Sequence, residues 1–288
     1  MTTISWIALR ALLERRGSSK KTALVRYLSH SGQEAIEAAL VPDRDPFSYD
    51  LSIPDRIKAV HYSWMIPFLE RLPEKDRVWV LSSLGSLQAA KLQLHFGMKH
   101  GLKRLNFHPK QFLQRFIYHW LISTQKGFIP REYLPTHPLN IILELSKSGI
   151  QHLVDFLGLH DLSIELKKVV KTEQFQKVKL GLSKQQCGYL KQLCEKREPV
   201  PFARLNLDGW DGNQTKLKNM LHHRGFNRLG KALFGCHPAL MWHITRRLDI
   251  GRTKILRKFF TDINNEKAHE SLKTQVINLV PFIRKHYE

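Results

Sequence analysis

The sequence has few acidic residues for its length. Its 288 residues include 25 Asp and Glu against 46 Lys and Arg, which gives a formal net charge of +21 at pH 7. A charge of this size bears on solubility and on partners rather than on the fold. It favours an anionic partner, which is nucleic acid, an acidic protein or an anionic membrane surface. A second interpretation stays open, in which the charge reflects a lineage of basic proteins or a subunit neutralised inside a complex.

Cysteine is also scarce, and no long apolar run is present. The cysteines, Cys187, Cys194 and Cys236, are an odd and sparse set that argues against a disulfide framework and indicates reduced thiols. No stretch approaches the roughly 18 apolar residues of a membrane-spanning helix. The apolar segment Ile4–Leu13 contains Arg10 and lacks both a basic leader and a small-residue cleavage site, which argues against a signal peptide. We therefore expect a cytoplasmic protein that neither spans a membrane nor is secreted.

Strict alternation of apolar and polar residues is scarce as well, so the sequence predicts no sheet. Apolar residues instead recur at spacings of three and four, which is typical of amphipathic helices. The clearest stripes are Val78–Leu87, Phe112–Leu121, Leu153–Leu166 and Leu240–Phe259. Hydrophobic residues make up 42% of the chain, which is enough for a core. The pattern predicts an all-α protein.

Proline and glycine separate the predicted helices. Breaks fall at Pro42–Pro46, at Pro130–Pro138 and in the loop Glu198–Gly212, whose prolines and Asp-Gly steps are incompatible with a helix. We predict four segments, which are an N-terminal helical segment at residues 1–50 and helical modules at 51–142, 143–205 and 206–288.

Helix ends are also predicted from local signals. Ser52 is expected to cap a helix, and the His-Pro steps at His108, His137 and His237 are each expected to begin one. The last helix is predicted over residues 266–287, with Pro281 bending or ending it.

Three segments share one outline, namely Leu69–Leu92, Leu143–Leu166 and Ala232–Leu256. Each has an apolar helix, a short turn that contains glycine, and a second helix that ends in leucine. Residues 22–40 are a degenerate fourth candidate. One such pair cannot bury its apolar face alone, so we expect the copies to stack as irregular helix–turn–helix modules of the armadillo type. Chance similarity among amphipathic helices is the alternative.

Motifs for chemistry are missing. Gly225–Ala232 comes close to a P-loop, but Ala232 replaces the Ser or Thr that would hold Mg²⁺, and a basic helical run precedes it instead of a strand. The 15 histidines form no His-Glu-x-x-His motif, and no Cys-x-x-Cys pair exists. Asp208 and Asp211 resemble turn residues. We therefore predict no catalytic residue, no metal, no cofactor and no small-molecule substrate. An enzyme assembled only in three dimensions would need a deep pocket with convergent polar groups.

The positive charge is concentrated in two spans without acidic residues, 77–131 and 212–248. We expect one partner-binding face at Arg246, Arg247, Arg252 and Lys254, and another at Lys99, Lys103, Arg104 and Lys110. Aromatic residues are interleaved in the first span, at Phe96, Phe107, Phe112, Phe116, Tyr118 and Trp120. They are able to stack on nucleic-acid bases. Their spacing of three and four favours the other interpretation, in which they are the buried stripe of the same helices.

Residues 143–198 resemble a helical module of the flagellar switch protein FliG. The resemblance lies in Ile150–Leu153, Asp161–Lys168, Gln176–Val178, Leu182–Gln185 and Leu190–Lys191. The charge pattern of the FliG torque helix is not evident. In the FliG family, helical segments of the type found at residues 143–198 stack and join a membrane-ring component to the rotor.

The C-terminal module resembles SctK proteins, which are accessory components of the type III secretion sorting platform. The resemblance lies in Arg228–Gly235, Arg246–Leu248 and Ile255–Leu256. It implies a non-enzymatic adaptor at the cytoplasmic face of the inner membrane, bridging the cytoplasmic domain of the inner-membrane ring to the SctQ-type pods. The rival expectation is a basic helical protein that binds nucleic acid through the same faces.

Overall fold

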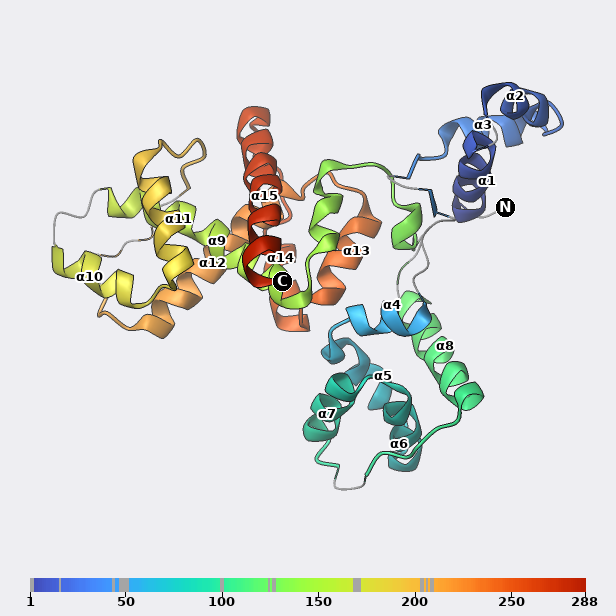
Figure 1. Cartoon of the computed structure of the whole chain (residues 1–288), viewed down its shortest axis with the longest axis horizontal. Helices are drawn as coiled ribbons and strands as arrows, with labels where there is room; N and C mark the ends of the chain where they lie inside the picture. Colours follow the sequence, from blue (N-terminus) through green and yellow to red (C-terminus); the bar gives the residue numbers. More distant parts are fainter. Residues whose placement is uncertain are drawn as a thin grey trace. The chain divides into compact units, whose positions relative to one another are not determined.

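A computed structural model describes residues 3–15, 17–42, 45–46, 52–98, 101–123, 125, 128–167, 172–202, 205, 207 and 210–288 (Figure 1). The structure is 73% helical, and the described residues contain no strand beyond one isolated bridge between Pro42 and Pro135. The predicted all-α class is therefore confirmed. Within the same residues, every helix is too short or too polar to cross a membrane.

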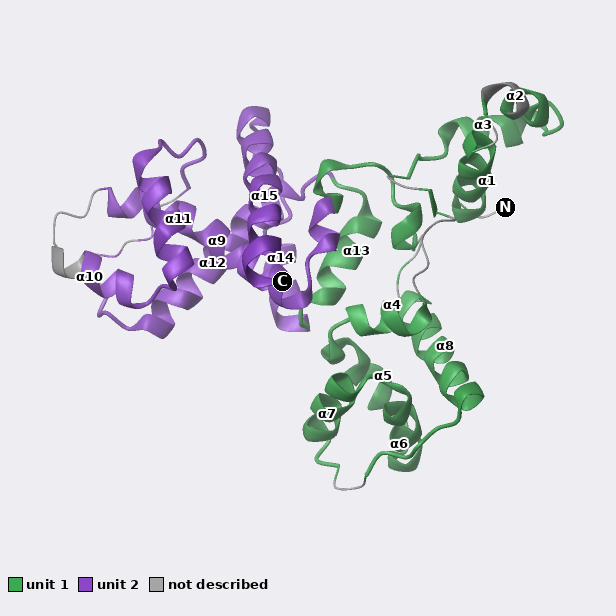
Figure 2. Ribbon diagram, viewed as in Figure 1, with its two compact units in different colours: residues 1–140, 236–249 green, residues 141–235, 250–288 purple. Residues whose placement is uncertain are grey.

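The chain divides into two compact units, coloured separately in Figure 2. Unit 1 comprises residues 1–140 and 236–249, and unit 2 comprises residues 141–235 and 250–288. The boundary at 140/141 lies close to a predicted one, at 142/143. The return of residues 236–249 to unit 1 is not visible in the sequence, because it depends on contacts between residues far apart in the chain.

Unit 1 begins with three helices, α1 (Thr3–Arg15), α2 (Ser18–Val25) and α3 (His30–Ala38). Helix α1 contacts both of the others. The guanidinium of Arg10 donates to the carbonyl oxygen of Glu37 at 2.9 Å, at the C-terminal end of α3. A cation is favourable there because the last carbonyls of a helix have no partner within it.

The remainder of unit 1 is a set of helices, of which those between residues 53 and 123 enclose one core. In chain order these are α4 (Ile53–Ala59), η2 (Tyr62–Met65), α5 (Ile66–Leu69), α6 (Glu74–Ser83), α7 (Ser86–His95), α8 (Phe107–Ser123), η3 (Arg131–Tyr133) and α13 (Pro238–Arg247). Helix α8 contacts α4 and α6. Leu69, Leu81, Leu92 and Leu121 are almost completely buried in this core.

Two hydrogen bonds explain why α13 belongs to unit 1. The backbone N–H of His61 donates to the carbonyl oxygen of Arg246 at 2.7 Å, and Trp64 Nε1–H donates to the carbonyl oxygen of Leu248 at 2.8 Å. Both bonds satisfy backbone carbonyls at the end of a helix, where such groups lack an intrahelical partner. They fix the end of α13 against the 61–64 segment.

Unit 2 is built around the long helix α9 (Lys147–Leu166), which is buried on nearly all sides. Its other helices are α10 (Thr172–Leu180), α11 (Lys184–Glu195), α12 (Gln214–Ala232), α14 (Ile250–Lys258) and α15 (Glu266–Tyr287), while η4 (Pro138–Glu144) spans the boundary between the units. Helix α9 contacts α11, α12 and α15 (Figure 1). A helix with apolar residues on most of its surface is stable when neighbouring helices cover it in this way.

Two glycines allow α9 and α12 to approach closely. A Cβ atom at Gly158 of α9 would lie 2.1 Å from the carbonyl oxygen of Leu221 in α12. A Cβ atom at Gly225 of α12 would lie 1.7 Å from the carbonyl oxygen of Val154 in α9. Both distances are far below van der Waals contact, so this crossing requires glycine on each helix.

The predicted helix ends are largely confirmed. Ser52 caps α4, the helices α8 and α13 begin at the steps containing His108 and His237, and η4 begins at Pro138. Two details are wrong. Helix α15 continues through Pro281, so the alternative in which Pro281 ends the helix is wrong. Helix α9 runs unbroken through its glycines, so the turn expected in the second repeat copy is absent.

Candidate protein-binding surface

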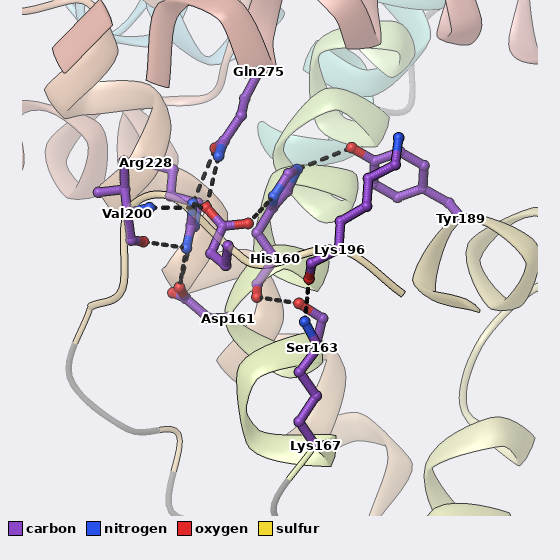
Figure 3. Close-up of polar contacts among 10 residues, drawn as sticks. His160, Asp161, Ser163, Lys167, Tyr189, Lys196, Val200, Arg228 and Gln275 are labelled. Atoms are coloured by element: carbon purple, nitrogen blue, oxygen red, sulfur yellow. Dashed lines mark hydrogen bonds and ion pairs between the residues drawn. The ribbon is translucent and has the colours of Figure 1, made fainter. Parts of the chain in front are cut away.

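A cluster of ionisable and polar side chains lies inside unit 2, where α9, α11, α12 and α15 meet (Figure 3). Arg228 of α12 is completely buried and donates to Asp161 Oδ1 from Nη2 at 2.5 Å and from Nε at 3.1 Å. Its Nη1 donates to Glu198 Oε1 at 2.9 Å and to Gln275 Oε1 at 3.0 Å. Its Nη2 also donates to the carbonyl oxygen of Val200 at 3.0 Å. All five N–H groups of the guanidinium are thus used.

Glu198 extends the cluster to a histidine and a tyrosine. Its Oε2 lies 2.6 Å from His160 Nδ1, and its Oε1 accepts from Gln275 Nε2 at 2.7 Å. His160 Nε2 lies 2.9 Å from the hydroxyl of Tyr189. Burial opposes ionisation of Glu198, but the His160 hydrogen bond and the Arg228 charge outweigh it and lower its pKa to about 2. Burial raises the pKa of Asp161 despite the same guanidinium.

This cluster is the nearest match to a site assembled in three dimensions. His160, Glu198 and Gln275 line a cavity of about 360 Å³. Both ring nitrogens of His160 and both carboxylate oxygens of Glu198 already have partners within the cluster, and the Gln275 amide bonds Glu198 and Arg228. A group that acts on a substrate needs a free proton or lone pair within reach of it. The cluster is therefore best explained as an internal cross-link of unit 2.

The predicted contact face at Arg246, Arg247, Arg252 and Lys254 is divided between the two units. Arg246 is buried, and its guanidinium carbon lies 3.8 Å from the ring centre of Trp64 and 5.5 Å from that of Trp242. It holds α13 in place and is not a surface contact. Arg247 is half-buried at the edge of a cavity of about 90 Å³ in unit 1. In unit 2, Arg252 is half-buried and Lys254 is exposed.

His243 lies in the same region of unit 1 and gives a prediction about acid stability. Its Nε2–H donates to the carbonyl oxygen of Ile129 at 3.0 Å. Burial, aided by the charges of Arg247, Arg131 and Arg56, lowers its pKa from 6.5 to about 4. The neutral form is favoured in the folded state, so stability is complete above pH 6.5 and falls as pH drops toward 4.

We expect unit 1 to lose about 2 kcal/mol of stability between pH 7 and pH 5 through this histidine. Urea unfolding at the two pH values measures the loss. A His243→Gln variant keeps a donor for Ile129 but does not titrate, so its stability should change less over this range. An identical pH dependence in both proteins would contradict the assignment.

The second predicted face lies in unit 1, along a groove between α6 and α8. Lys99 lies outside the described residues. Lys103, Arg104 and Lys110 are exposed, and Arg104 lines the groove. The Nζ of Lys103 lies 4.0 Å from the ring centre of Trp79, within the range of a cation–π contact. Arg104 and Lys103 therefore lie at the groove, while Lys110 follows the lining residue Pro109 in the chain, and their role in binding a partner stays a prediction.

The groove has a volume of about 890 Å³ and a mainly apolar lining. The apolar side chains are Leu72, Trp79, Val80, Leu105, Pro109, Phe112, Leu113 and Phe116, and the polar positions are Asp76, Arg104 and Asn106. The ring of Phe116 also contacts the core, since its centre lies 5.7 Å from that of the core residue Phe68. The groove is thus an open extension of the core of unit 1.

Exposed aromatic rings distinguish this groove from an ordinary surface. Phe112 is 69% exposed, Phe116 50% and Trp79 42%. Phe107, on the same helix, is 67% exposed. The interpretation of the aromatic residues as a buried stripe is therefore wrong for Phe107, Phe112 and Phe116. Phe96, Tyr118 and Trp120 are partly buried against the core, as that interpretation expects.

The remaining sequence motifs have no site of their own. The P-loop-like residues 225–232 lie within α12, so they form no phosphate-binding loop. Within the described part of the chain, no three His, Cys, Asp or Glu side chains are grouped to hold a metal ion. No protein-family model matches the chain, and no curated protein or solved structure is significantly similar to it.

Proposed function

We propose that the protein is a non-enzymatic helical adaptor that binds an acidic protein partner through the groove of unit 1. The observation that carries this proposal is the row of open aromatic side chains, Trp79, Phe112 and Phe116, beside exposed lysine and arginine. Monomeric proteins rarely leave such a contiguous apolar patch in water, and patches bordered by polar residues are typical of protein interfaces. Aromatic residues are also the side chains that most often dominate binding energy.

The assembly that we propose is the cytoplasmic sorting platform of a type III secretion system. Support comes from the resemblance of residues 143–198 to FliG and of Arg228–Gly235, Arg246–Leu248 and Ile255–Leu256 to SctK proteins. In this proposal the helices stack as modules of the armadillo or FliG type and form a stiff spacer. The spacer bridges the inner-membrane ring to the SctQ-type pods. The net charge of +21 would also favour contact with the anionic inner surface of that membrane.

Affinity purification from a native host tests this assignment. A tagged chain should recover ring or pod components of the secretion system, and a Phe112→Asp variant should recover them poorly. Recovery of none of these components by the unaltered chain would overturn the platform assignment.

Nucleic-acid binding is the second candidate, because open aromatic rings next to cations are also suited to stacking on single-stranded bases. Such binding depends steeply on salt, since counterions are released from the phosphates. Gel-shift assays at low and at physiological salt distinguish the two candidates. Absent binding at low salt removes this candidate, while tight, sequence-selective binding at physiological salt removes the adaptor.

A further inference from the structure

We infer that the groove of unit 1 receives an amphipathic helix whose apolar stripe is flanked by Asp and Glu. The inference rests on the proposed function, because it names the chemistry of the partner at the same surface. Three properties of the groove support it, namely its walls, the spacing of its aromatic side chains and the charge at its border.

The walls of the groove are helices. It lies between α6 and α8, and residues 104–106 complete its lining. The described residues of unit 1 include no strand with a free edge, so an extended peptide would find no ladder of backbone hydrogen bonds to join. A helix satisfies its own backbone and needs only side-chain contacts, which is the mode of binding in an apolar groove between helices.

The spacing of the open rings fits helical anchors. Phe112 and Phe116 are four residues apart on α8, so they lie one turn apart on the same face of that helix. Val80, Leu105 and Leu113 also line the groove, and each is less exposed than the rings. A partner helix presents side chains at i, i+3, i+4 and i+7, which can enter such a row of apolar sites. A nucleic-acid base would contact the rings but would leave this aliphatic lining without a partner.

The border of the groove selects the charge of the helix. Residues 77–131 contain no acidic residue, Arg104 lines the groove and is exposed, and the exposed Lys103 lies over the ring of Trp79. Asp76 is the acidic side chain in the lining, and it lies in the first turn of α6. The border of the groove therefore carries more positive than negative charge. Acidic residues on the partner helix would meet these cations, and a basic helix would be repelled.

A synthetic helix tests the inference on the full chain. The probe is a labelled peptide of about 20 residues with leucine at i, i+3, i+4 and i+7 and glutamate at most other positions. The control peptides are a scrambled sequence and a version with lysine in place of glutamate. Fluorescence anisotropy should show binding of the acidic helix and at least about tenfold weaker binding of both controls.

Two variants locate the binding. Phe112→Asp should weaken binding of the acidic helix by about 30-fold or more, because it places a carboxylate at an aromatic contact. Phe112 is 69% exposed, so the change should leave the circular dichroism spectrum intact. Phe175→Asp is the matched control, since Phe175 is exposed in unit 2 and should not affect binding.

A charge swap tests selectivity. The double variant Lys103→Glu/Arg104→Glu should bind the acidic helix more weakly than the unaltered chain does and the lysine helix more tightly. Lys191→Glu, at an exposed position of α11, should change neither affinity. Equal affinities of the double variant and the unaltered chain for both peptides would overturn the role of charge in the inference.

The outcomes separate this inference from the proposed function. If the acidic helix binds no better than the scrambled peptide, the inference is overturned. The adaptor proposal still stands if affinity purification with the Phe112→Asp variant recovers less of the partner proteins than the unaltered chain does. If an oligonucleotide of single-stranded DNA binds the groove and Phe112→Asp abolishes that binding, both the acidic helix and the adaptor are overturned in favour of the nucleic-acid function.

Discussion

Replacing Arg228 with methionine should lower the free energy of unfolding of unit 2 by about 3–5 kcal/mol, because it leaves two buried carboxylates without their cation. Asp161 and Glu198 are almost completely buried and both accept hydrogen bonds from this guanidinium. Without it, Glu198 would keep only His160, Gln275 and a long backbone bond from Val200 as partners. Urea unfolding at pH 7, followed by circular dichroism, measures the effect.

Two further variants test whether the loss of stability comes from the unpaired carboxylates. The triple variant Arg228→Met/Asp161→Leu/Glu198→Leu removes the charges together, and it should recover much of the lost stability. Lys191→Met removes an exposed cation and should change stability by less than about 0.5 kcal/mol. A single Arg228→Met variant as stable as the unaltered chain would contradict the view that the cluster cross-links unit 2.

Replacing Gly225 with alanine should destabilise unit 2 by about 3 kcal/mol or more. The added Cβ would lie 1.7 Å from the carbonyl oxygen of Val154, which belongs to the backbone of α9 and cannot rotate away. Overpacking of a core costs about 1–3 kcal/mol where side chains can yield, and more where they cannot. Gly158→Ala should act in the same direction, since its Cβ would lie 2.1 Å from the carbonyl oxygen of Leu221.

Gly188→Ala is the matched control for both variants. Gly188 lies inside α11, and no atom lies within 4 Å of an added Cβ. Alanine is a better helix former than glycine, so this variant should gain up to about 1 kcal/mol. Urea unfolding of the three variants tests the comparison. A loss in Gly188→Ala as large as that in Gly225→Ala would show that glycine is required for backbone reasons and not for the close crossing of α9 and α12.

The helices of this protein could be predicted because their signals are local. Ser52, the His-Pro steps and the apolar spacing each act within a few residues, and the structure confirms them. The role of Gly158 could not be predicted in the same way. A glycine between two apolar stretches fits a turn as well as a close helix crossing, and the choice depends on Leu221, which lies far along the chain.

The candidate surface was predicted only in part. The sequence places Lys103, Arg104 and Lys110 in an acid-free span, and the structure exposes all three, with Arg104 in the lining of the groove and Lys103 over Trp79. The sequence alone could not distinguish these exposed cations from Arg246, which has the same charge but packs its buried side chain on Trp64. Periodicity also gives Phe112 and Phe116 the pattern of a buried stripe, because an open groove and a closed core follow the same helical spacing.

The buried cluster of unit 2 was missed altogether, although a weak signal existed. Arg228 lies in the segment that resembles a P-loop, and His160 and Asp161 interrupt the long apolar run of α9. Charged residues within an apolar helix are almost never buried unless they are paired. That rule predicts partners for Asp161, but the identity of Arg228 and Glu198 depends on the packing of α9, α12 and the loop after α11.

The central claim is that the groove of unit 1 is the surface that binds a protein partner, and site-specific cross-linking in the native host tests it most directly. A photoreactive amino acid at position 112 should give one or a few discrete adducts with other proteins. The same amino acid at position 175, which is also exposed but lies in unit 2, should give none of them. Adducts with the ring or pod proteins would support the proposed platform. Absence of any protein adduct from position 112 would contradict the account.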